Sequence, residues 1–341
     1  MPLISVIVLN WNGKAIIEAC LNSLLDQTHT PFEIILVDNG STDGSPQLLE
    51  SKYVAKISLI KSKINTGFAG GVDIGIQHSK GEFIALFNSD AVAEKNWLSE
   101  LMSRILESPS IGMCASKIYL SGSHKIFDNT GEVISRDGLG KGRGRLEKDT
   151  GQYDLQTDVL CPSGCAALYR RQMLEEIGGM DTRFFAYGED IDIGLRGRML
   201  GYKAVFCPKA IVHHALSASS SLVSPLKAFY VERNRLWIVL KCFPLPHLAA
   251  AAFYSLQRYF YHFQGLFSRR GPASQYVEKF SWPSLLLTII KVYLSTFWNL
   301  PYLMRKRAVF AKKTTWNARD FEACLKRYGI SARDAALQEL G

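Results

Sequence analysis

Short apolar runs alternate with amphipathic segments through the first quarter of the chain. Ile4–Leu9 is a run of aliphatic and β-branched residues whose length predicts a buried strand. Similar runs predict strands over Ile34–Val37, Lys56–Ile60 and Glu82–Phe87, and the apolar spacing in Ala15–Leu25 predicts a helix. Strands that alternate with helices indicate a mainly parallel sheet with helices on both faces.

Polar residues follow the ends of several of these strands. Asn10, Asp38 and Asp90 each come at or just after the end of an apolar run. In open α/β sheets, ligands bind beyond the carboxyl ends of the strands. We therefore expect these three residues to lie around one crevice.

The middle of the chain predicts further elements. Glu189–Leu200 has the apolar spacing of a helix, with Asp192 and Arg196 as an i,i+4 ion pair. Gly138–Arg145 is basic and too rich in glycine for a helix or a strand, so it predicts a loop. The remaining apolar runs predict three strands: Val159–Tyr169 with a break at Pro162–Gly164, Ala204–Phe206, and Ala210–Val212 beyond Pro208.

The last third of the chain predicts long aromatic and basic helices. Trp282–Leu300 has a single charged residue, Lys291, and its polar residues recur every three or four positions. A narrow polar stripe on an apolar helix is typical of a helix lying in a membrane interface. A central lysine would cost a spanning helix roughly 2.5–3.5 kcal/mol. Leu245–Phe267 is similar, with seven aromatic residues. Packing of both helices on the rest of the protein is the alternative.

The charges are divided unevenly along the 341 residues. The net charge is +9, but the chain up to Ser224 has 22 Lys and Arg against 25 Asp and Glu. From Pro225 onward there are 18 basic residues against 6 acidic ones. The interleaved apolar residues favour an anionic membrane surface over nucleic acid as the partner of this region. The first residues lead directly into a strand, so we expect no secretory signal.

Seven scattered cysteines indicate free, mostly buried thiols in a reducing cytosol. Cys161 and Cys165 are four residues apart, but no second pair completes a zinc pattern.

Three short acidic segments are candidates for chemistry. Asp38 stands at a strand end before a turn, where it could bind a nucleotide or cap the turn. Asp90 ends Asn88-Ser89-Asp90, and one carboxylate with substrate phosphates is enough to bind Mg²⁺ or Mn²⁺. Glu189 and Asp190 begin a predicted helix, whose positive end would help to keep a catalytic base ionised. In isolation, each segment could equally be a turn or a helix cap.

Together with Asn65-Thr66-Gly67-Phe68-Ala69-Gly70-Gly71 and His214, these segments resemble the nucleotide-sugar-dependent glycosyltransferases of family 2, which have the GT-A fold. The resemblance covers roughly Leu3 to Leu236. It implies an α/β fold with a mixed, mainly parallel sheet in a catalytic domain over residues 1–224. The nucleotide-sugar half would be about 1–110 and the acceptor half about 111–224. A helical region, residues 225–341, would contact the membrane.

The resemblance also implies roles for individual residues. Asp190 would be the catalytic base, with Glu189 supporting it, and Asp90 with His214 rather than His213 would bind Mg²⁺ or Mn²⁺. Asn88 stands where the family usually has a first aspartate, so Asp90 is the clearer ligand. The residues expected to bind the nucleotide-sugar donor are Leu9, Asn10, Asn12, Asp38, Asn65, Gly67, Gly70 and Ser89.

Within the family, the motifs most resemble rhamnosyltransferases that build O-antigen and other surface polysaccharides. This implies an inverting transferase that moves L-rhamnose from dTDP-L-rhamnose to a lipid-linked glycan, bound peripherally at the cytoplasmic face of the cell membrane, without nucleic acid. The alternatives are a UDP- or GDP-sugar donor, a sugar nucleotidyltransferase, and a non-catalytic, membrane-bound polysaccharide-assembly protein. A nucleotidyltransferase would need a phosphate loop richer in glycine and lysine than Asn10–Lys14.

Overall fold

The computed structural model describes residues 3–123, 125–215 and 223–338. The chain divides into two compact units. Unit 1 comprises Met1–Glu132 and Gly142–Ser220, and unit 2 comprises Val133–Lys141 and Ser221–Gly341. Unit 2 therefore includes a short segment from the middle of the unit 1 sequence.

Unit 1 is an α/β unit. Its strands are β1 (Ile4–Asn10), β2 (Phe32–Asn39), β3 (Ser58–Ser62), β4 (Phe83–Asn88), β5 (Ala91–Ala93), β6 (Ile111–Leu120), β7 (Phe127–Asn129), β10 (Ala166–Arg170) and β11 (Lys203–His214). Its helices are α1 (Ile17–Leu25), α2 (Ser45–Lys52), α3 (Gly67–His78), α4 (Trp97–Ile105), α5 (Arg171–Ile177), the 3₁₀ helix η1 (Thr182–Phe184) and α6 (Glu189–Met199).

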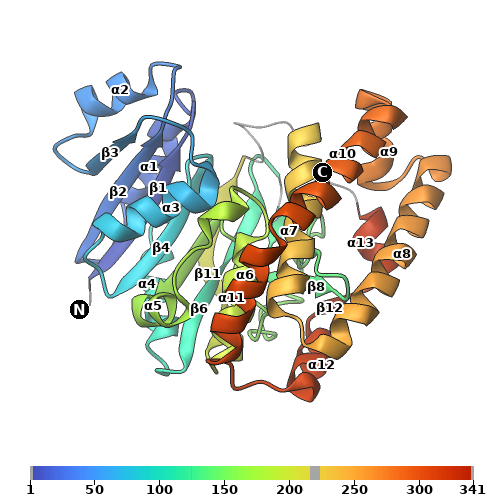
Figure 1. Ribbon diagram of the computed structural model, residues 1–341. Helices are drawn as coiled ribbons and strands as arrows, with labels where there is room; N and C mark the ends of the chain where they lie inside the picture. The colour runs from blue at the N-terminus through green and yellow to red at the C-terminus, as the bar shows by residue number, and fades with distance from the viewer. Residues whose placement is uncertain (1–2, 124, 216–222, 339–341) are drawn as a thin grey trace. The chain divides into compact units, whose positions relative to one another are not determined.

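These strands form one mixed sheet in the order β3-β2-β1-β4-β10-β6-β11-β5, with β7 paired to β6 (Figure 1). Strands β3, β2, β1 and β4 are parallel, whereas β10 runs antiparallel to both β4 and β6. The predicted mixed, mainly parallel sheet is therefore confirmed.

Helices cover both faces of this sheet, as predicted. On one face, Leu21 of α1 and Trp97 of α4 are buried in one core cluster with alternate residues of the sheet, such as Val6 of β1, and Trp97 contacts Phe87 of β4. On the other face, α3 packs so closely that an added Cβ at Gly75 would lie 2.5 Å from the Ile7 side chain. Side chains alternate along a strand, which is why Val6 and Ile7 serve opposite faces.

Three local predictions are wrong in part. The Gly138–Arg145 segment contains strand β9 (Gly140–Gly142), because Gly138 adopts a left-handed turn (φ 87°) that brings β9 beside β8 (Glu132–Ser135). Only Ala166–Arg170 of the strand expected over Val159–Tyr169 is regular. The two strands expected around Pro208 are one strand, β11, in which a register shift between Cys207 and Ile211 accommodates the proline.

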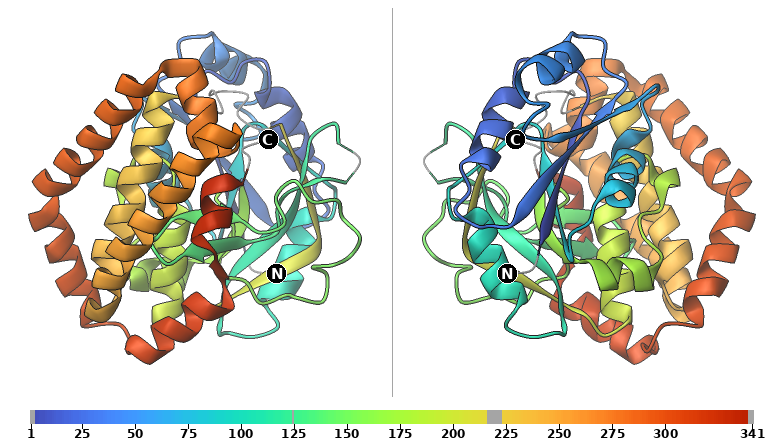
Figure 2. Two further views of the ribbon diagram at one scale, coloured as in Figure 1. Left: turned by 90° about the vertical axis from the view of Figure 1, so that its right-hand side faces the viewer. Right: turned by 90° about the vertical axis from the view of Figure 1, so that its left-hand side faces the viewer.

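Unit 2 is mainly helical. Its elements are β8, β9, α7 (Pro225–Cys242), α8 (Leu245–Ser268), α9 (Gly271–Phe280), α10 (Trp282–Trp298), α11 (Leu300–Ala311), α12 (Ala318–Arg327), β12 (Gly329–Ile330) and α13 (Ala332–Leu337). Strands β12, β8 and β9 form a small sheet. Helices α10 and α11 lie along the outer side of α7 in both views of Figure 2.

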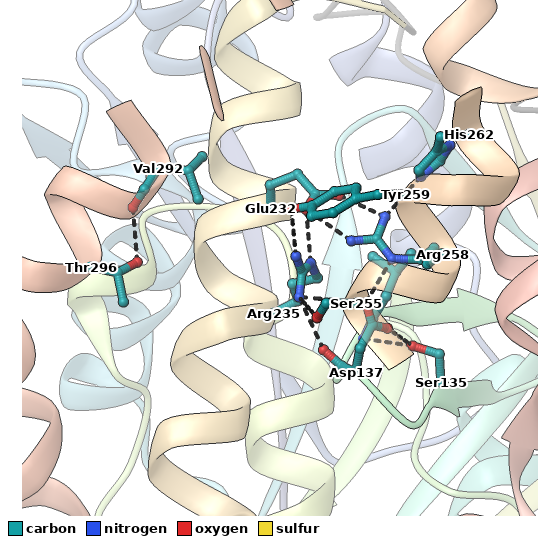
Figure 3. A network of polar contacts seen from close by, with 11 residues as sticks. Ser135, Asp137, Glu232, Arg235, Ser255, Arg258, Tyr259, His262, Val292 and Thr296 are labelled. Atoms are coloured by element: carbon teal, nitrogen blue, oxygen red, sulfur yellow. Dashed lines mark hydrogen bonds and ion pairs between the residues drawn. The ribbon is translucent and has the colours of Figure 1, made fainter. Parts of the chain in front are cut away.

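A buried ion network holds unit 2 together (Figure 3). Arg258 donates from Nε to Asp137 Oδ2 at 2.7 Å and from Nη1 to Glu232 Oε1 at 2.8 Å. Arg235 donates from Nε to Glu232 Oε2 at 2.8 Å and lies 3.4 Å from Asp137 Oδ2. Burial raises the pKa of Asp137, but the two arginines outweigh this effect and hold it below the ordinary 3.8. The Asp137 turn is thereby fixed to α7 and α8.

Among the described residues, no single helix combines the length and apolar composition needed to cross a bilayer. Helices α9 and α10 meet that criterion only as a pair, and they are bent by 117° where they join. All seven cysteines are free and buried, as their scattered spacing indicates.

The ion network makes the stability of unit 2 sensitive to one carboxylate. Asp137→Asn leaves two buried arginines facing a neutral amide, so we expect the free energy of unfolding of unit 2 to fall by about 3–5 kcal/mol in urea denaturation. Glu322→Gln is the control, because its ion pair with Arg136 is partly exposed and its loss should cost less than about 1 kcal/mol. The folded pKa of Asp137 is lowered, so its contribution is lost as the pH falls through that value. Asp137→Asn should lack this acid-dependent loss. Equal free energies of unfolding for Asp137→Asn and Glu322→Gln would contradict the role of the network.

Candidate active site

The carboxyl ends of three parallel strands meet at one edge of the unit 1 sheet. The register pairs Asn10 of β1 with Asp38 of β2, and Leu9 of β1 with Asn88 of β4. Asp90 follows two residues after Asn88. The structure thus brings together the strand-end residues in which the sequence indicates chemistry.

Asn10 and Asp38 form a buried hydrogen-bonded pair at this edge. Asn10 donates from Nδ2 to Asp38 Oδ1 and to Ser45 Oγ, both at 2.9 Å. Asp38 Oδ2 accepts from the Ser41 amide at 3.2 Å, so this carboxylate does cap its turn. Asn10 Oδ1 is buried and has no hydrogen-bond partner in the described part of the chain. This leaves an acceptor beside the pair that an N–H or O–H of a ligand could satisfy.

Asn12 ties the end of β1 to the same turn. Its amide donates to Ser41 Oγ at 2.9 Å, and its Oδ1 accepts from the Thr42 amide at 2.8 Å. Asn12 adopts a left-handed backbone (φ 52°), a conformation that asparagine tolerates better than most residues.

The Asn65–Gly71 segment is organised by Asn39 at the end of β2. Asn39 donates from Nδ2 to Asn65 Oδ1 and to the Gly67 carbonyl, both at 3.0 Å. Gly67 has φ 74°, and a Cβ there would lie 2.4 Å from the Phe185 carbonyl oxygen. The start of α3 therefore contacts the segment that precedes Glu189 and Asp190.

The glycines of this segment allow close packing within unit 1. A Cβ on Gly71 would lie 2.2 Å from the Leu9 side chain, and one on Gly70 would lie 2.8 Å from Thr66. The space beside both glycines is already filled by protein. The Leu9 side chain therefore packs against α3. Ser89, which follows β4 and precedes Asp90 in the sequence, is half-buried.

Asp90 and His214 contact each other, and a third residue orients the histidine. His214 Nε2 lies 3.1 Å from Asp90 Oδ1, and His214 Nδ1 lies 2.8 Å from Asp128 Oδ2. Asp128 also pairs with Arg145. His213 points to the other side of β11, where it is 41% exposed near Glu94. The continuation after Ala215 that also carries the family resemblance, Leu216–Ser219, lies outside the described residues.

The charge state of His214 follows from these neighbours. Burial disfavours the imidazolium, but Cys165 and the hydrogen bonds to Asp128 and Asp90 outweigh this and hold its pKa well above 6.5. The two carboxylates thus favour the charged form of His214, and a cation that binds Nε2 would displace the proton on that nitrogen.

Asp90 and His214 suit a partial metal site. Among the described residues, no three His, Cys, Asp or Glu side chains are grouped so that they could hold one ion. However, Asp90 Oδ1 and His214 Nε2 are 3.1 Å apart, close to the roughly 3 Å between adjacent ligands of an octahedral ion bound at about 2.1 Å. Mg²⁺ usually takes one or two protein ligands and completes its shell with water and substrate phosphates. The two side chains fit that pattern.

Glu132, Glu189 and Asp190 form a second group of carboxylates. Asp190 is the second residue of α6, and its Oδ1 accepts from the Ile191 amide at 2.8 Å while its Oδ2 accepts from the Gly164 amide at 3.4 Å. Glu132 Oε1 accepts from Asn129 Nδ2 at 2.7 Å. Glu189 Oε2 is buried without a hydrogen-bond partner among the described residues.

Burial raises the pKa of all three carboxyl groups. For Glu132, burial and then the charge of Asp190 raise the pKa to about 8. The same two causes raise the pKa of Glu189 well above 4.5, and burial raises that of Asp190 above 3.8. The sequence indicates that the helix end would keep Asp190 ionised and weaken it as a base. Burial raises this pKa in spite of the helix end, and the raised pKa strengthens Asp190 as a base.

Strand β7 joins the two groups. Asp128 contacts His214, and its neighbour Asn129 donates to Glu132, whose charge acts on Asp190. Neither Asp128 nor Glu132 is among the residues that the sequence predicts for the site. Both lie on strands of three or four residues, too short for an apolar run to reveal.

A family model described as "Glycosyl transferase family 2" matches residues 5–178, just over half of the chain. The chain belongs to this family. It is 25% identical over 266 residues to the O-antigen biosynthesis protein RfbC of Myxococcus xanthus, covering 74% of this chain and 20% of that protein. It is also 25% identical over 263 residues to the N-acetylglucosaminyl-diphospho-decaprenol L-rhamnosyltransferase of Mycobacterium tuberculosis, covering 68% of this chain and 85% of that one.

A solved structure supports the fold of this family 2 member. The Pyrobaculum calidifontis mannosyltransferase PcManGT, in complex with GDP-Man and Mn²⁺, matches 96% of this chain and 80% of its own with a TM-score of 0.51 and 18% identity. The predicted GT-A type of α/β fold is thus confirmed. The chain spans only 20% to 54% of the length of four curated relatives that it matches.

The raised pKa of Glu132 predicts a pH-dependent stability of unit 1. The folded state binds the Glu132 proton more tightly than the unfolded state, so this group's contribution to stability falls as the pH rises from 4.5 to about 8. Glu132→Gln keeps the acceptor for Asn129 and removes the charge. We expect the melting temperature of this variant to rise relative to the unsubstituted protein between about pH 5 and about pH 9.

The exposed Glu175→Gln is the matched control, and its difference from the unsubstituted protein should not change over the same range. If the difference in melting temperature between Glu132→Gln and the unsubstituted protein were equally independent of pH, the raised pKa of Glu132 would be contradicted.

Proposed function

We propose that this protein transfers a sugar from a nucleoside diphosphate donor to an acceptor hydroxyl, with inversion at the anomeric carbon. The observation that carries the proposal is the link through β7, which joins a candidate cation pair, Asp90 and His214, to a candidate base, Asp190, through Asp128 and Glu132. Leaving-group stabilisation and proton removal are the two tasks that this reaction needs. Membership of family 2 supports the same reaction.

Each group has a distinct role in the proposal. Asp38 and Asn10 bind the base and ribose, with Asn10 Oδ1 offering an acceptor that no described residue satisfies. Asp190 takes the proton of the acceptor hydroxyl as its oxygen bonds to the anomeric carbon and the bond to the diphosphate breaks. Glu189 supports the site, and its Oε2, buried without a hydrogen-bond partner among the described residues, is available to the acceptor. The remaining proposed donor contacts are Leu9, Asn12, Asn65, Gly67, Gly70 and Ser89.

Asp90 and His214 would hold Mg²⁺ or Mn²⁺, which would neutralise the charge that develops on the departing nucleoside diphosphate. Asp128 positions His214 for this role through the bond to Nδ1. The Mn²⁺ in the mannosyltransferase structure supports a divalent cation here.

The donor we propose is dTDP-L-rhamnose, and the acceptor is a lipid-linked glycan of a surface polysaccharide at the cytoplasmic face of the cell membrane. The names of the two relatives, an O-antigen biosynthesis protein and an L-rhamnosyltransferase acting on a decaprenol diphosphate, support this choice. A UDP- or GDP-sugar is the alternative donor. A non-catalytic role in polysaccharide assembly would require that no nucleotide sugar is turned over.

A donor screen tests the first part of the proposal. We expect dTDP with Mn²⁺ to raise the melting temperature of the protein, and we expect dTDP without Mn²⁺, or UDP and GDP with it, to have little effect. Asp90→Ala should abolish the dependence on Mn²⁺, because it removes the only carboxylate of the pair. A rise in melting temperature with UDP or GDP instead of dTDP would indicate a UDP- or GDP-sugar as the donor. No rise with any of the three nucleotides would contradict nucleotide binding.

Asp190→Asn tests the base. The amide keeps an acceptor for the Ile191 amide but cannot take up a proton, so we expect transfer to fall by about 10²–10⁴-fold with donor binding unchanged. The measurement is the release of nucleoside diphosphate from the donor identified in the screen. Asp26→Asn, an exposed carboxylate of α1's C-terminal cap, is the control and should retain full activity. Activity that survives Asp190→Asn would overturn the assignment.

A further inference from the structure

The outer side of α10 is apolar along its length except for Lys291. Leu286, Phe297 and Trp298 are 59%, 66% and 77% exposed, and Leu287, Ile290 and Leu294 are exposed between them. Exposed apolar residues are common singly, but a continuous helical face of large side chains marks an interaction surface. We call these six residues the α10 outer face.

The inner side of the same helix carries its polar residues. Thr288 and Thr296 are buried, and their hydroxyls bond to carbonyls of their own helix, those of Ser284 and Val292, each at 2.9 Å (Figure 3 shows the second bond). The Tyr276 hydroxyl of α9 lies 3.0 Å from Thr288 Oγ1. The polar stripe seen in the sequence therefore faces protein, and only its lysine, Lys291, is exposed.

This arrangement is the reverse of a helix that borders water. A helix on a water-exposed surface buries its large apolar side chains and exposes its polar ones. Here small hydroxyls are satisfied internally against α7 and α9, which leaves the large side chains to be covered from outside the protein. The sequence pattern alone gives the two sides of the helix but not which side faces the protein.

The charges around this face are almost all positive. Within residues 245–313, eight basic residues are exposed and the only acidic residue is Glu278. Four of the eight, Arg305, Lys306, Lys312 and Lys313, follow the outer face on and after α11. A partner that covers the face must therefore accept a high density of positive charge.

We infer that the α10 outer face lies in the interfacial layer of an anionic lipid bilayer, parallel to its plane, with the basic residues at the headgroups. One side of α10 packs along α7 and α9 while the other is exposed from end to end, which suits a helix lying flat. Trp298 and the aromatic Tyr293 have the amphipathic rings that favour this layer. Lys291 has a stem long enough to bring its charge to the headgroups.

A second copy of the chain fits this surface less well. A symmetric pair meeting through the same face would bring the basic residues of both copies together, and like charges repel. An anionic bilayer supplies the opposite charge as well as the apolar layer. The inference goes beyond the proposed transfer reaction and does not depend on it.

The test measures binding of the full-length protein to sedimented vesicles of phosphatidylcholine with phosphatidylglycerol. Leu294→Glu with Phe297→Glu places two carboxylates on the outer face, and both sites are exposed, so folding is preserved. We expect the partition coefficient to fall by at least about ten-fold. Leu155→Glu, on the 95% exposed Leu155 of unit 1, is the matched control and should bind as the unsubstituted protein does.

A second variant separates the charge from the apolar contact. Arg305→Ser with Lys306→Ser should weaken binding roughly five-fold per residue on phosphatidylglycerol vesicles and have little effect on phosphatidylcholine alone. Undiminished binding of the Leu294→Glu/Phe297→Glu variant would overturn the inference. The inference would also be overturned if the unsubstituted protein bound neither kind of vesicle but sedimented as a dimer that the Leu294→Glu/Phe297→Glu substitutions dissociate. Donor binding by each variant, measured by thermal shift, confirms that unit 1 is intact.

Discussion

The pairing of β1 with both β2 and β4 is the constraint on which the candidate site depends. It aligns Asn10 with Asp38 and Leu9 with Asn88, so that residues from three separate stretches of sequence reach one edge. A slip of one residue would turn every side chain of β1 to the opposite face. The close approach of α3 at Gly71 and Gly75 prevents this, because that face of β1 has no space for a different set of side chains.

Two buried carboxylates of this chain show how neighbours decide the charge state. Asp137 and Glu132 are both removed from water, which by itself raises the pKa of each. Asp137 faces Arg258 and Arg235, and it is held ionised as a structural anchor. Glu132 faces chiefly the carboxylate of Asp190, and it is held protonated to about pH 8. Burial with a cation favours a fixed ion pair, whereas burial with a like charge favours an exchangeable proton.

The sequence reveals those parts of the fold that rest on local patterns. Apolar runs locate β1, β2 and β4 to within a few residues, and the polar residues after them include Asp38 and Asp90. Asp128 is invisible at this level because its role depends on a contact with His214, 86 residues further along the chain. The direction of the α10 stripe is equally hidden, since helical periodicity defines two sides without saying what covers either.

Val133–Lys141 belongs to unit 2 although it lies within the unit 1 sequence, and this arrangement has a consequence for synthesis of the chain. Asp137 leaves the ribosome 121 residues before Arg258, its partner in the ion network. At about 5–20 residues per second, the turn waits roughly 6–24 s for that partner. During this interval, unit 1 can begin to fold around a turn whose carboxylate still lacks Arg258. The sequence of unit 1 is complete before most of unit 2 is synthesised, and this order favours folding of unit 1 first.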